Sequence, residues 1–258
     1  MKHFLIASAA LLPAWSAASA QDGDELRVRV GLGAQVRPDF IGADSSEVAP
    51  LWRVNVARGT DPFKFSAPDY SFGIPMISSG GFSVGPAANI ASGRKNSDLD
   101  VSVGKVKTTI EAGAFASYQL TESLYLRAEA LKGLGGHDGV VGTVGADQIW
   151  RDGDRYVFSI GPRILFSESR YQRSFFGVSP EAALASGLPT YRPGGGVHAV
   201  AAASSFSYQF DPRWGVFGYG RYERLVGDAA KSPIVRELGS RNQLSGGIGL
   251  SYTFTMKR

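Results

Sequence analysis

The 258-residue chain contains no cysteine, which removes several kinds of chemistry at once. Thiol catalysis and Cys-based metal sites are excluded, and a chain of this length buries a core without disulfide staples. A large excess of charge of one sign is also missing, because 27 basic residues stand against 23 acidic ones. That balance is too even for a nucleic-acid-binding arm. We expect no nucleic-acid partner and no cofactor.

Long hydrophobic runs are scarce. The apolar run at residues 4–12 is too short to span a bilayer, which takes about 20 residues. It follows the basic Lys2 and precedes Ala18-Ser19-Ala20, in the order of a secretory signal and its cleavage site. We predict that residues 1–20 are a cleaved signal peptide. Residues 21–258 contain no second long run, so no transmembrane helix is expected, and a soluble exported protein or a β-barrel remains.

Apolar and polar residues alternate with a period of two through most of the remaining chain. In residues 243–256, large apolar side chains take one parity, and small or polar ones take the other. Such a period predicts a β-strand with one apolar face. The other clear strands are predicted at residues 26–37, 82–91, 107–120, 124–130, 139–150, 155–166, 195–210 and 213–225.

The least regular part of the chain is residues 47–77, which contain four prolines. Proline cannot donate to a β-ladder, so bends or sheet edges are expected here. Both ends of an outer-membrane barrel lie on the periplasmic side, which makes the strand number even. The region must therefore supply one strand or three, giving ten or twelve. We prefer twelve, with two short strands near Phe63 and Phe72.

Short and long connections alternate along the chain, and aromatic residues gather beside the short ones. Outer-membrane barrels have short periplasmic turns, long extracellular loops and aromatic girdles. We predict an all-β protein: a transmembrane antiparallel up-and-down β-barrel in the Gram-negative outer membrane, in contact with lipid and lipopolysaccharide. Its short turns contain Glu122, Arg151, Asp152, Asp154 and Asp211.

Charged residues on the polar parity of the strands should face the lumen. They either pair across it and plug it, or line a narrow, weakly anion-selective pore. We favour pairing, because lone buried charges are costly and both signs are present. The predicted lumen charges are Arg27, Arg29, Arg53, Glu111, Arg127, Glu129, Arg163, Arg221 and Glu223.

Candidate catalytic residues are few. His198 with Ser204 or Ser205 on one wall would suit a lipid hydrolase. No carboxylate or Asn is spaced to orient His198, so we interpret these residues as an interfacial His and small packing serines. His137 lies in a glycine-rich loop and is expected to be solvated. We expect no catalytic and no metal site.

Two long connections contain the most distinctive strings, 171–191 and 224–235. Together they resemble the MipA/OmpV family of outer-membrane proteins, over essentially the whole exported chain. One departure is the end of the chain, where Phe254 is followed by four more residues. The residues that carry the resemblance are Tyr171, Phe176, Gly177, Val178, Ser179, Ser186, Gly187, Leu188, Arg224, Gly227, Asp228, Ser232 and Pro233.

The resemblance implies an integral barrel without enzymatic activity. One role in that family is a scaffold that bridges a murein lytic transglycosylase and a murein synthase, and other members are described as porin-like, osmoregulated or adhesive. Our leading hypothesis is such a scaffold, with the short turns as the surface that murein enzymes reach. A narrow pore for small solutes is the alternative, and a lipid hydrolase is the least favoured.

Overall fold

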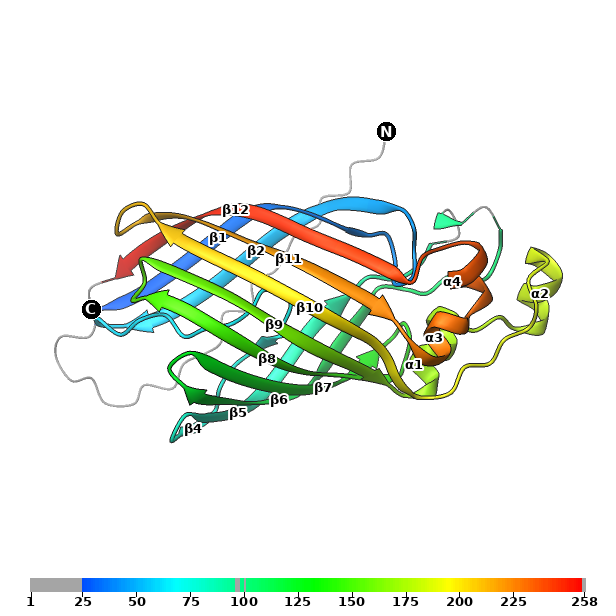
Figure 1. The fold of residues 1–258 in the computed structure, drawn as a ribbon, viewed down its shortest axis with the longest axis horizontal. Helices are drawn as coiled ribbons and strands as arrows, with labels where there is room; N and C mark the ends of the chain where they lie inside the picture. Colours follow the sequence, from blue (N-terminus) through cyan, green and yellow to red (C-terminus); the bar gives the residue numbers. More distant parts are fainter. Residues whose placement is uncertain (1–24, 96–97, 100, 257–258) are drawn as a thin grey trace.

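The computed structural model describes residues 25–95, 98–99 and 101–256. The predicted signal peptide lies outside the described residues. The described chain forms a twelve-stranded antiparallel sheet that curls into a barrel (Figure 1). Its strands are β1 (Leu26–Pro38), β2 (Ser46–Arg58), β3 (Phe72–Gly73), β4 (Ile77–Ser79), β5 (Phe82–Ala91), β6 (Thr109–Thr121), β7 (Leu124–Leu134), β8 (Val140–Asp152), β9 (Tyr156–Ser167), β10 (Gly196–Gln209), β11 (Trp214–Leu225) and β12 (Asn242–Met256).

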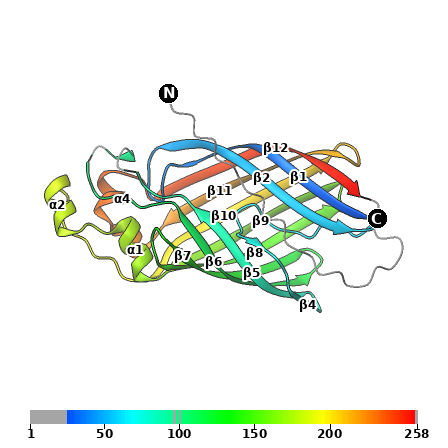
Figure 2. The ribbon, with the colours of Figure 1, turned by 180° about the vertical axis from the view of Figure 1, so that it is seen from behind.

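The strand order follows the chain, except that β1 pairs with both β2 and β12. Leu26 lies opposite Met256, so the first and last strands join. The predicted up-and-down barrel of twelve strands is confirmed. One seam remains, because the described residues form no ladder between β2 and the edge made by β3, β4 and β5 (Figure 2). Pro50 lies in β2, where a missing donor is tolerated because one side of an edge strand is unpaired.

The apolar side chains of the strands face outward. Trp52 of β2 is 60% exposed and Leu250 of β12 is 57% exposed, whereas Ser251, its neighbour in the chain, is 1% exposed. A water-soluble sandwich would bury the larger residues and expose the serine. An apolar outer wall around a polar interior is the arrangement of a barrel that faces lipid.

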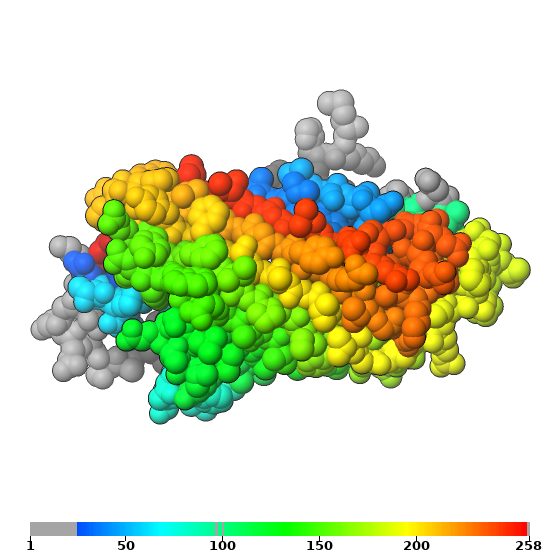
Figure 3. All heavy atoms as spheres, in the orientation of Figure 1, coloured from blue at the N-terminus to red at the C-terminus, as the bar shows by residue number. Residues whose placement is uncertain are grey.

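The two ends of the barrel differ. The short turns and the end of β12 lie at one end, and the long loops lie at the other, where they carry the helices (Figure 1, Figure 3). Aromatic rings contact one another at the short-turn end, as in the pairs Trp150–Phe158 and Trp214–Tyr252. The helices are α1 (Ser169–Phe176), α2 (Pro180–Ser186), α3 (Gly227–Lys231) and α4 (Pro233–Glu237). None of the helices in the described part of the chain is long and apolar enough to cross a membrane.

The helices and loops at this end form a lid with an apolar core of its own. Phe176 and Ile234 have no exposed surface, and they belong to neighbouring clusters that also contain Phe40, Val178 and Leu225. Each cluster collects residues from several loops that are far apart in sequence. Burial of these side chains therefore holds the long loops together over the barrel mouth.

The connection from β2 to β3, residues 59–71, runs inside the barrel and is called the luminal segment. Phe63 and Tyr70 are buried, although the segment contains no strand. The predicted short strand near Phe63 is therefore wrong, whereas the one near Phe72 is present as β3, and the second short strand is β4. Side chains of the wall replace ladder partners at Phe63: its N–H donates to Asp154 at 2.9 Å, and its carbonyl accepts from Arg151 at 3.2 Å.

Candidate functional site in the barrel lumen

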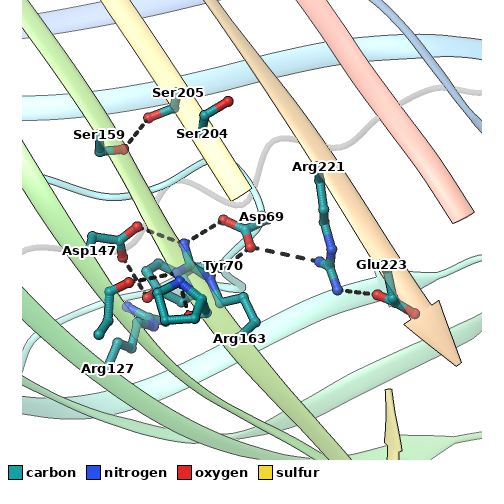
Figure 4. Close-up of polar contacts among 12 residues, drawn as sticks. Asp69, Tyr70, Arg127, Asp147, Ser159, Arg163, Ser204, Ser205, Arg221 and Glu223 are labelled. Carbon is teal, nitrogen blue, oxygen red and sulfur yellow. Dashed lines mark hydrogen bonds and ion pairs between the residues drawn. The ribbon is translucent and has the colours of Figure 1, made fainter. Parts of the chain in front are cut away.

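Arg163 of β9 is the central residue of the polar contacts in the lumen, and its side chain is fully buried. Its Nε and Nη2 donate to the two carboxylate oxygens of Asp69 at 2.9 and 3.1 Å (Figure 4). Nη2 also donates to Asp147 of β8 at 2.8 Å. Paired hydrogen bonds from one guanidinium to one carboxylate fix both distance and orientation. Arg163 thus ties the luminal segment to the barrel wall.

The ladder between β8 and β9 has a gap at Asp147. The register pairs Gly145 with Arg163 and then resumes at Gln148 and Ile160. Pro162 lies in this gap and has no backbone N–H to donate. The Arg163 side chain supplies a replacement, since Nη1 donates to the Ala146 carbonyl at 3.1 Å.

Tyr70 completes this contact between segment and wall. Its hydroxyl donates to Asp147 at 2.7 Å, and its ring lies under the guanidinium of Arg163, 4.5 Å from ring centre to Cζ. A guanidinium over an aromatic face is attracted by the ring quadrupole. Asp147 therefore accepts from both Tyr70 and Arg163, and its charge is compensated in the lumen.

Arg221 of β11 approaches Asp69 from the other side. One guanidinium nitrogen lies 3.8 Å from the Asp69 carboxylate, and another forms an ion pair with Glu223 (Figure 4). Asp69 is therefore held between two guanidinium groups, Arg163 and Arg221, that belong to different strands. The arrangement places a carboxylate of the segment in a site built by the wall.

A second group of polar contacts holds the C-terminal end of the luminal segment, at Ser71. The Ser71 hydroxyl donates to Glu129 at 2.5 Å, and the Ser71 carbonyl accepts from Arg127 at 3.0 Å. Arg127 also pairs with Glu129 at 3.1 Å and stacks on Phe115, with Cζ 4.1 Å from the ring centre. Charged residues of the wall thus bind the luminal segment at two places, Asp69 and Ser71.

The remaining predicted lumen charges also face inward. Arg27 pairs with Asp154 at 3.0 Å and donates to the Asp61 carbonyl of the segment. Arg29 covers the Phe63 ring at 4.1 Å, while Arg53 lies over Phe217 at 5.2 Å. The lumen near the short turns is therefore lined by guanidinium groups that stack on aromatic rings.

Glu111 finds a partner that the sequence interpretation missed. It contacts Nε2 of His137 at 2.9 Å, and the histidine side chain is fully buried. The expectation of a solvated His137 is wrong, because the loop between β7 and β8 folds inward against α1, where Tyr171 packs on the imidazole. Among the described residues, no group of three or more His, Asp or Glu side chains is placed to hold a metal ion.

The possible Ser-His site does not assemble. His198 is buried, and its Nδ1 lies 3.1 Å from the Ser167 hydroxyl. Ser204 donates instead to the Gly220 carbonyl at 3.4 Å, and Ser205 pairs with Ser159 at 2.7 Å (Figure 4). Nε2 of His198 is buried without a hydrogen-bond partner among the described residues, and neither Ser204 nor Ser205 is placed against His198.

The motif residues of the long loops build the lid. Ser179 caps α2 by accepting from the Ala182 N–H at 3.2 Å, and Gly187 ends that helix at a φ of 77°, where a side chain would be strained. The buried Ser232 hydroxyl donates to the Phe176 carbonyl at 2.7 Å. Asp228 accepts from the Gly194 N–H at 2.9 Å, so the two motif-bearing loops are joined.

Other motif residues have packing roles or lie at the surface. Tyr171, Val178 and Leu188 are buried, whereas Arg224 is exposed and donates to Asn242 at 3.0 Å. Gly227 has a positive φ of 58° at the start of α3. Pro233 is buried at the first turn of α4, while Gly177 and Ser186 are partly buried.

The predicted turn residues divide into two groups. Arg151 and Asp154 turn inward to the luminal segment. Glu122, Asp152 and Asp211 are exposed at the end of the barrel. The N–H groups of Trp214 and Arg213 donate to Asp211 and hold the pKa of its carboxyl below its usual value.

Sequence interpretation missed Asp69, Tyr70 and Asp147. Asp147 lies within the strand predicted at residues 139–150, with the same parity as the inward Gly145, so its inward position could have been found. Asp69 and Tyr70 lie in an irregular segment, where no period indicates which side chain faces the wall. Their role depends on contacts with strands far along the chain.

The fold and this lumen define a transmembrane antiparallel β-barrel with a segment of its own chain bound inside it. The family model described as MltA-interacting protein MipA matches residues 30–254. The chain therefore belongs to the MipA family.

Comparison with curated proteins found no match. Among solved structures, the KdgM porin is 11% identical, with 89% of this chain and 99% of that chain covered and a TM-score of 0.37. An outer-membrane channel from Pseudomonas putida F1 is 8% identical, with coverage of 92% and 97% and a TM-score of 0.43. The outer-membrane channel DcaP of Acinetobacter baumannii is 9% identical, with coverage of 90% and 97% and a TM-score of 0.39.

Proposed function

We propose that this protein is a non-enzymatic scaffold of the Gram-negative outer membrane that binds murein-processing enzymes through its short-turn end. The family name, MltA-interacting protein, supports a protein partner of this kind. The observation that carries the proposal is the segment bound in the lumen, where Asp69 is held between Arg163 and Arg221. Because a segment of the chain occupies the interior of the barrel, we assign partner binding to the exposed surface at its end.

The short-turn end is the surface that we assign to the partners. It exposes acidic residues, among them Glu122 and Asp152, beside the aromatic rings of the girdle. Murein enzymes act in the periplasm, which the short turns of an outer-membrane barrel face. The partner classes that we propose are a murein lytic transglycosylase and a murein synthase. The exposed Arg155 and Arg213 lie in the same turns, so this surface presents both signs of charge. Exposed charges that complement those of a partner steer association and raise the on-rate.

The test is retention of a lytic transglycosylase and a murein synthase on the purified full chain in detergent. We expect the wild-type protein to retain them, and Glu122→Lys/Asp152→Lys to lose roughly tenfold in affinity, equivalent to about 1.4 kcal/mol. The matched control is Asp44→Lys/Glu237→Lys, which makes the same charge change on exposed residues of the opposite end. Failure of the wild-type protein to retain either enzyme, or equal losses in both variants, contradicts the proposal.

A narrow channel for small solutes is the second candidate. The specific observation in its favour is that the luminal segment has no regular secondary structure and is bound to the wall through charged and polar groups. Such contacts exchange with water more readily than an apolar core does. A planar bilayer that contains the purified barrel measures this conductance directly.

A further inference from the structure

The site that surrounds Asp69 has the geometry of a receptor for a carboxylate. Arg163 presents two N–H donors in one plane to the two oxygens, and Arg221 lies on the far side. The side chain of Asp69 is only 4% exposed, and that of Arg163 is fully buried. Donors held in this fork are the usual means by which proteins recognise carboxylates.

Acceptor groups of the barrel wall orient both guanidinium groups of this site, and the Tyr70 ring of the luminal segment packs under Arg163. Arg163 is positioned by the carbonyls of Ala146 and Pro162, each 3.1 Å from Nη1. Arg221 is positioned by its ion pair with Glu223. Both guanidinium groups are therefore oriented by acceptors of the barrel wall, and Asp69 supplies the carboxylate between them.

We propose that Arg163 and Arg221 form a carboxylate-binding site in the lumen, and that Asp69 occupies it as an internal ligand. Small free carboxylates bind there when the Asp69 carboxylate is absent. This inference goes beyond the scaffold proposal and does not depend on it, because it concerns the lumen and not the short-turn surface.

The geometry also gives the ligand class. The site offers N–H donors and positive charge on two sides, while Asp147 and Glu223 already accept hydrogen bonds from Tyr70, Arg163 or Arg221. A neutral molecule of the same shape forms weaker hydrogen bonds with these guanidinium groups, because it carries no charge of its own to pair with them. The preferred ligand is therefore a monocarboxylate about the size of the Asp69 side chain.

Removal of the internal ligand provides the test. Asp69→Ala deletes the carboxylate of Asp69, and acetate supplies a free carboxylate about the size of the whole Asp69 side chain, so acetate should restore the full chain when it is added to the variant in detergent. At ten times its Kd, acetate should multiply the equilibrium constant for folding by about eleven, since a ligand specific for the folded state stabilises by a factor of 1 + [L]/Kd. The melting temperature of the variant should rise accordingly.

Four controls give the result its meaning. Acetamide has the shape of acetate without its charge and should not restore Asp69→Ala. Asp69→Asn fills the same space and should not respond to acetate. Asp61→Ala removes an exposed carboxylate from the same segment and should not respond either. Asp69→Ala/Arg221→Gln should need a higher acetate concentration for the same gain.

Two outcomes overturn the proposal. One is an equal effect of acetate and acetamide on Asp69→Ala at matched ionic strength. The other is an equal acetate effect on Asp61→Ala. If Asp69→Ala does not fold in chloride, its refolding yield from urea in acetate and in acetamide becomes the measurement, and the same two comparisons decide. Retention of murein enzymes is scored separately, so failure here leaves the scaffold test intact.

Discussion

The luminal segment and the lid are two regions of the same barrel that are held by different physical means. The segment is held by charged hydrogen bonds, as at Asp69 and Arg163, together with a small aromatic cluster in which Phe65 and Tyr70 pack with Tyr125 of the wall. The lid is held chiefly by apolar burial, as at Phe176 and Ile234. The difference follows from location. A segment inside a polar lumen must satisfy the wall charges, whereas loops outside the barrel are free to gather into a core.

Among its described residues the lid contains a buried arginine, Arg94, which sharpens this contrast. Arg94 donates to the Phe175 carbonyl at 2.6 Å and to the Gly104 carbonyl at 3.2 Å. Its guanidinium lies over Phe40, 5.7 Å from the ring centre. Burial lowers the pKa of Arg94 to about 10, so it remains charged at neutral pH. Arg94 binds loop carbonyls, whereas Arg163 binds carboxylates.

The largest expected effect is that of Arg163→Gln, which would break the polar side of this comparison. The change leaves Asp69 and Asp147 buried without their shared cation, and breaking a buried pair costs about 3–5 kcal/mol. We expect the luminal segment to become sensitive to protease in folded barrels while the lid stays protected. Urea unfolding and limited proteolysis measure the two effects.

Arg170→Gln is the matched control, because Arg170 is an exposed arginine of α1. It should change the free energy of unfolding by less than about 0.5 kcal/mol, the range of ordinary surface substitutions. Equal destabilisation by the two changes would mean that the charge network of the lumen does not hold the segment.

Ile234→Ala tests whether apolar burial holds the lid. Ile234 has no exposed surface, and truncation of a buried isoleucine to alanine costs about 2–5 kcal/mol through lost burial and the cavity left behind. We expect the lid to become sensitive to protease and the luminal segment to remain protected. The reverse pattern, with the segment released first, would show that the two regions are not held independently.

The smallest expected effect concerns Asp228, which joins two loops of the lid. Hydrogen bonding from the Gly194 N–H holds the pKa of Asp228 below its usual value. A carboxyl with a lowered folded pKa stabilises above its unfolded pKa, about 3.9, and this stability is lost as the pH falls through the folded pKa. Because Asp228 is largely exposed, the contribution should be below about 1 kcal/mol.

The measurement for Asp228 is the pH dependence of urea unfolding in the wild-type protein and in Asp228→Asn. The wild-type protein should lose more stability than the variant as the pH falls below about 4. Parallel pH curves for the two proteins would contradict the role assigned to this carboxyl. Asp44→Asn, an exposed carboxyl in the loop between β1 and β2, serves as the control.

Much of the wall could be predicted from the sequence, because a strand that separates lipid from a polar lumen records both environments in alternate residues. Leu250 and Ser251 illustrate the rule in β12. The luminal segment could not be predicted in this way. Phe63 and Phe65 share a parity and suggested a strand, but Phe63 is buried by wall arginines and its backbone is satisfied by side chains.

The site was predictable in part for the same reason. Inward charges such as Arg127 and Arg163 follow from strand parity, but their partners do not. Asp69 reaches Arg163 across 94 residues of sequence, and no local pattern records that contact. The motif strings of the long loops mark residues that build the lid, and not residues of the luminal site.

The pairing of β1 with β12 can form only when both strands are present, so this junction belongs to a late step of barrel assembly. Leu26 lies opposite Met256, so β1 pairs with a strand at the far end of the described chain. Contacts so distant along a chain are slow to form, because the entropy of closing the loop is lost before the contacts are gained. A polypeptide that is interrupted during export would lack this junction, and its first strand would have β2 as its sole neighbour.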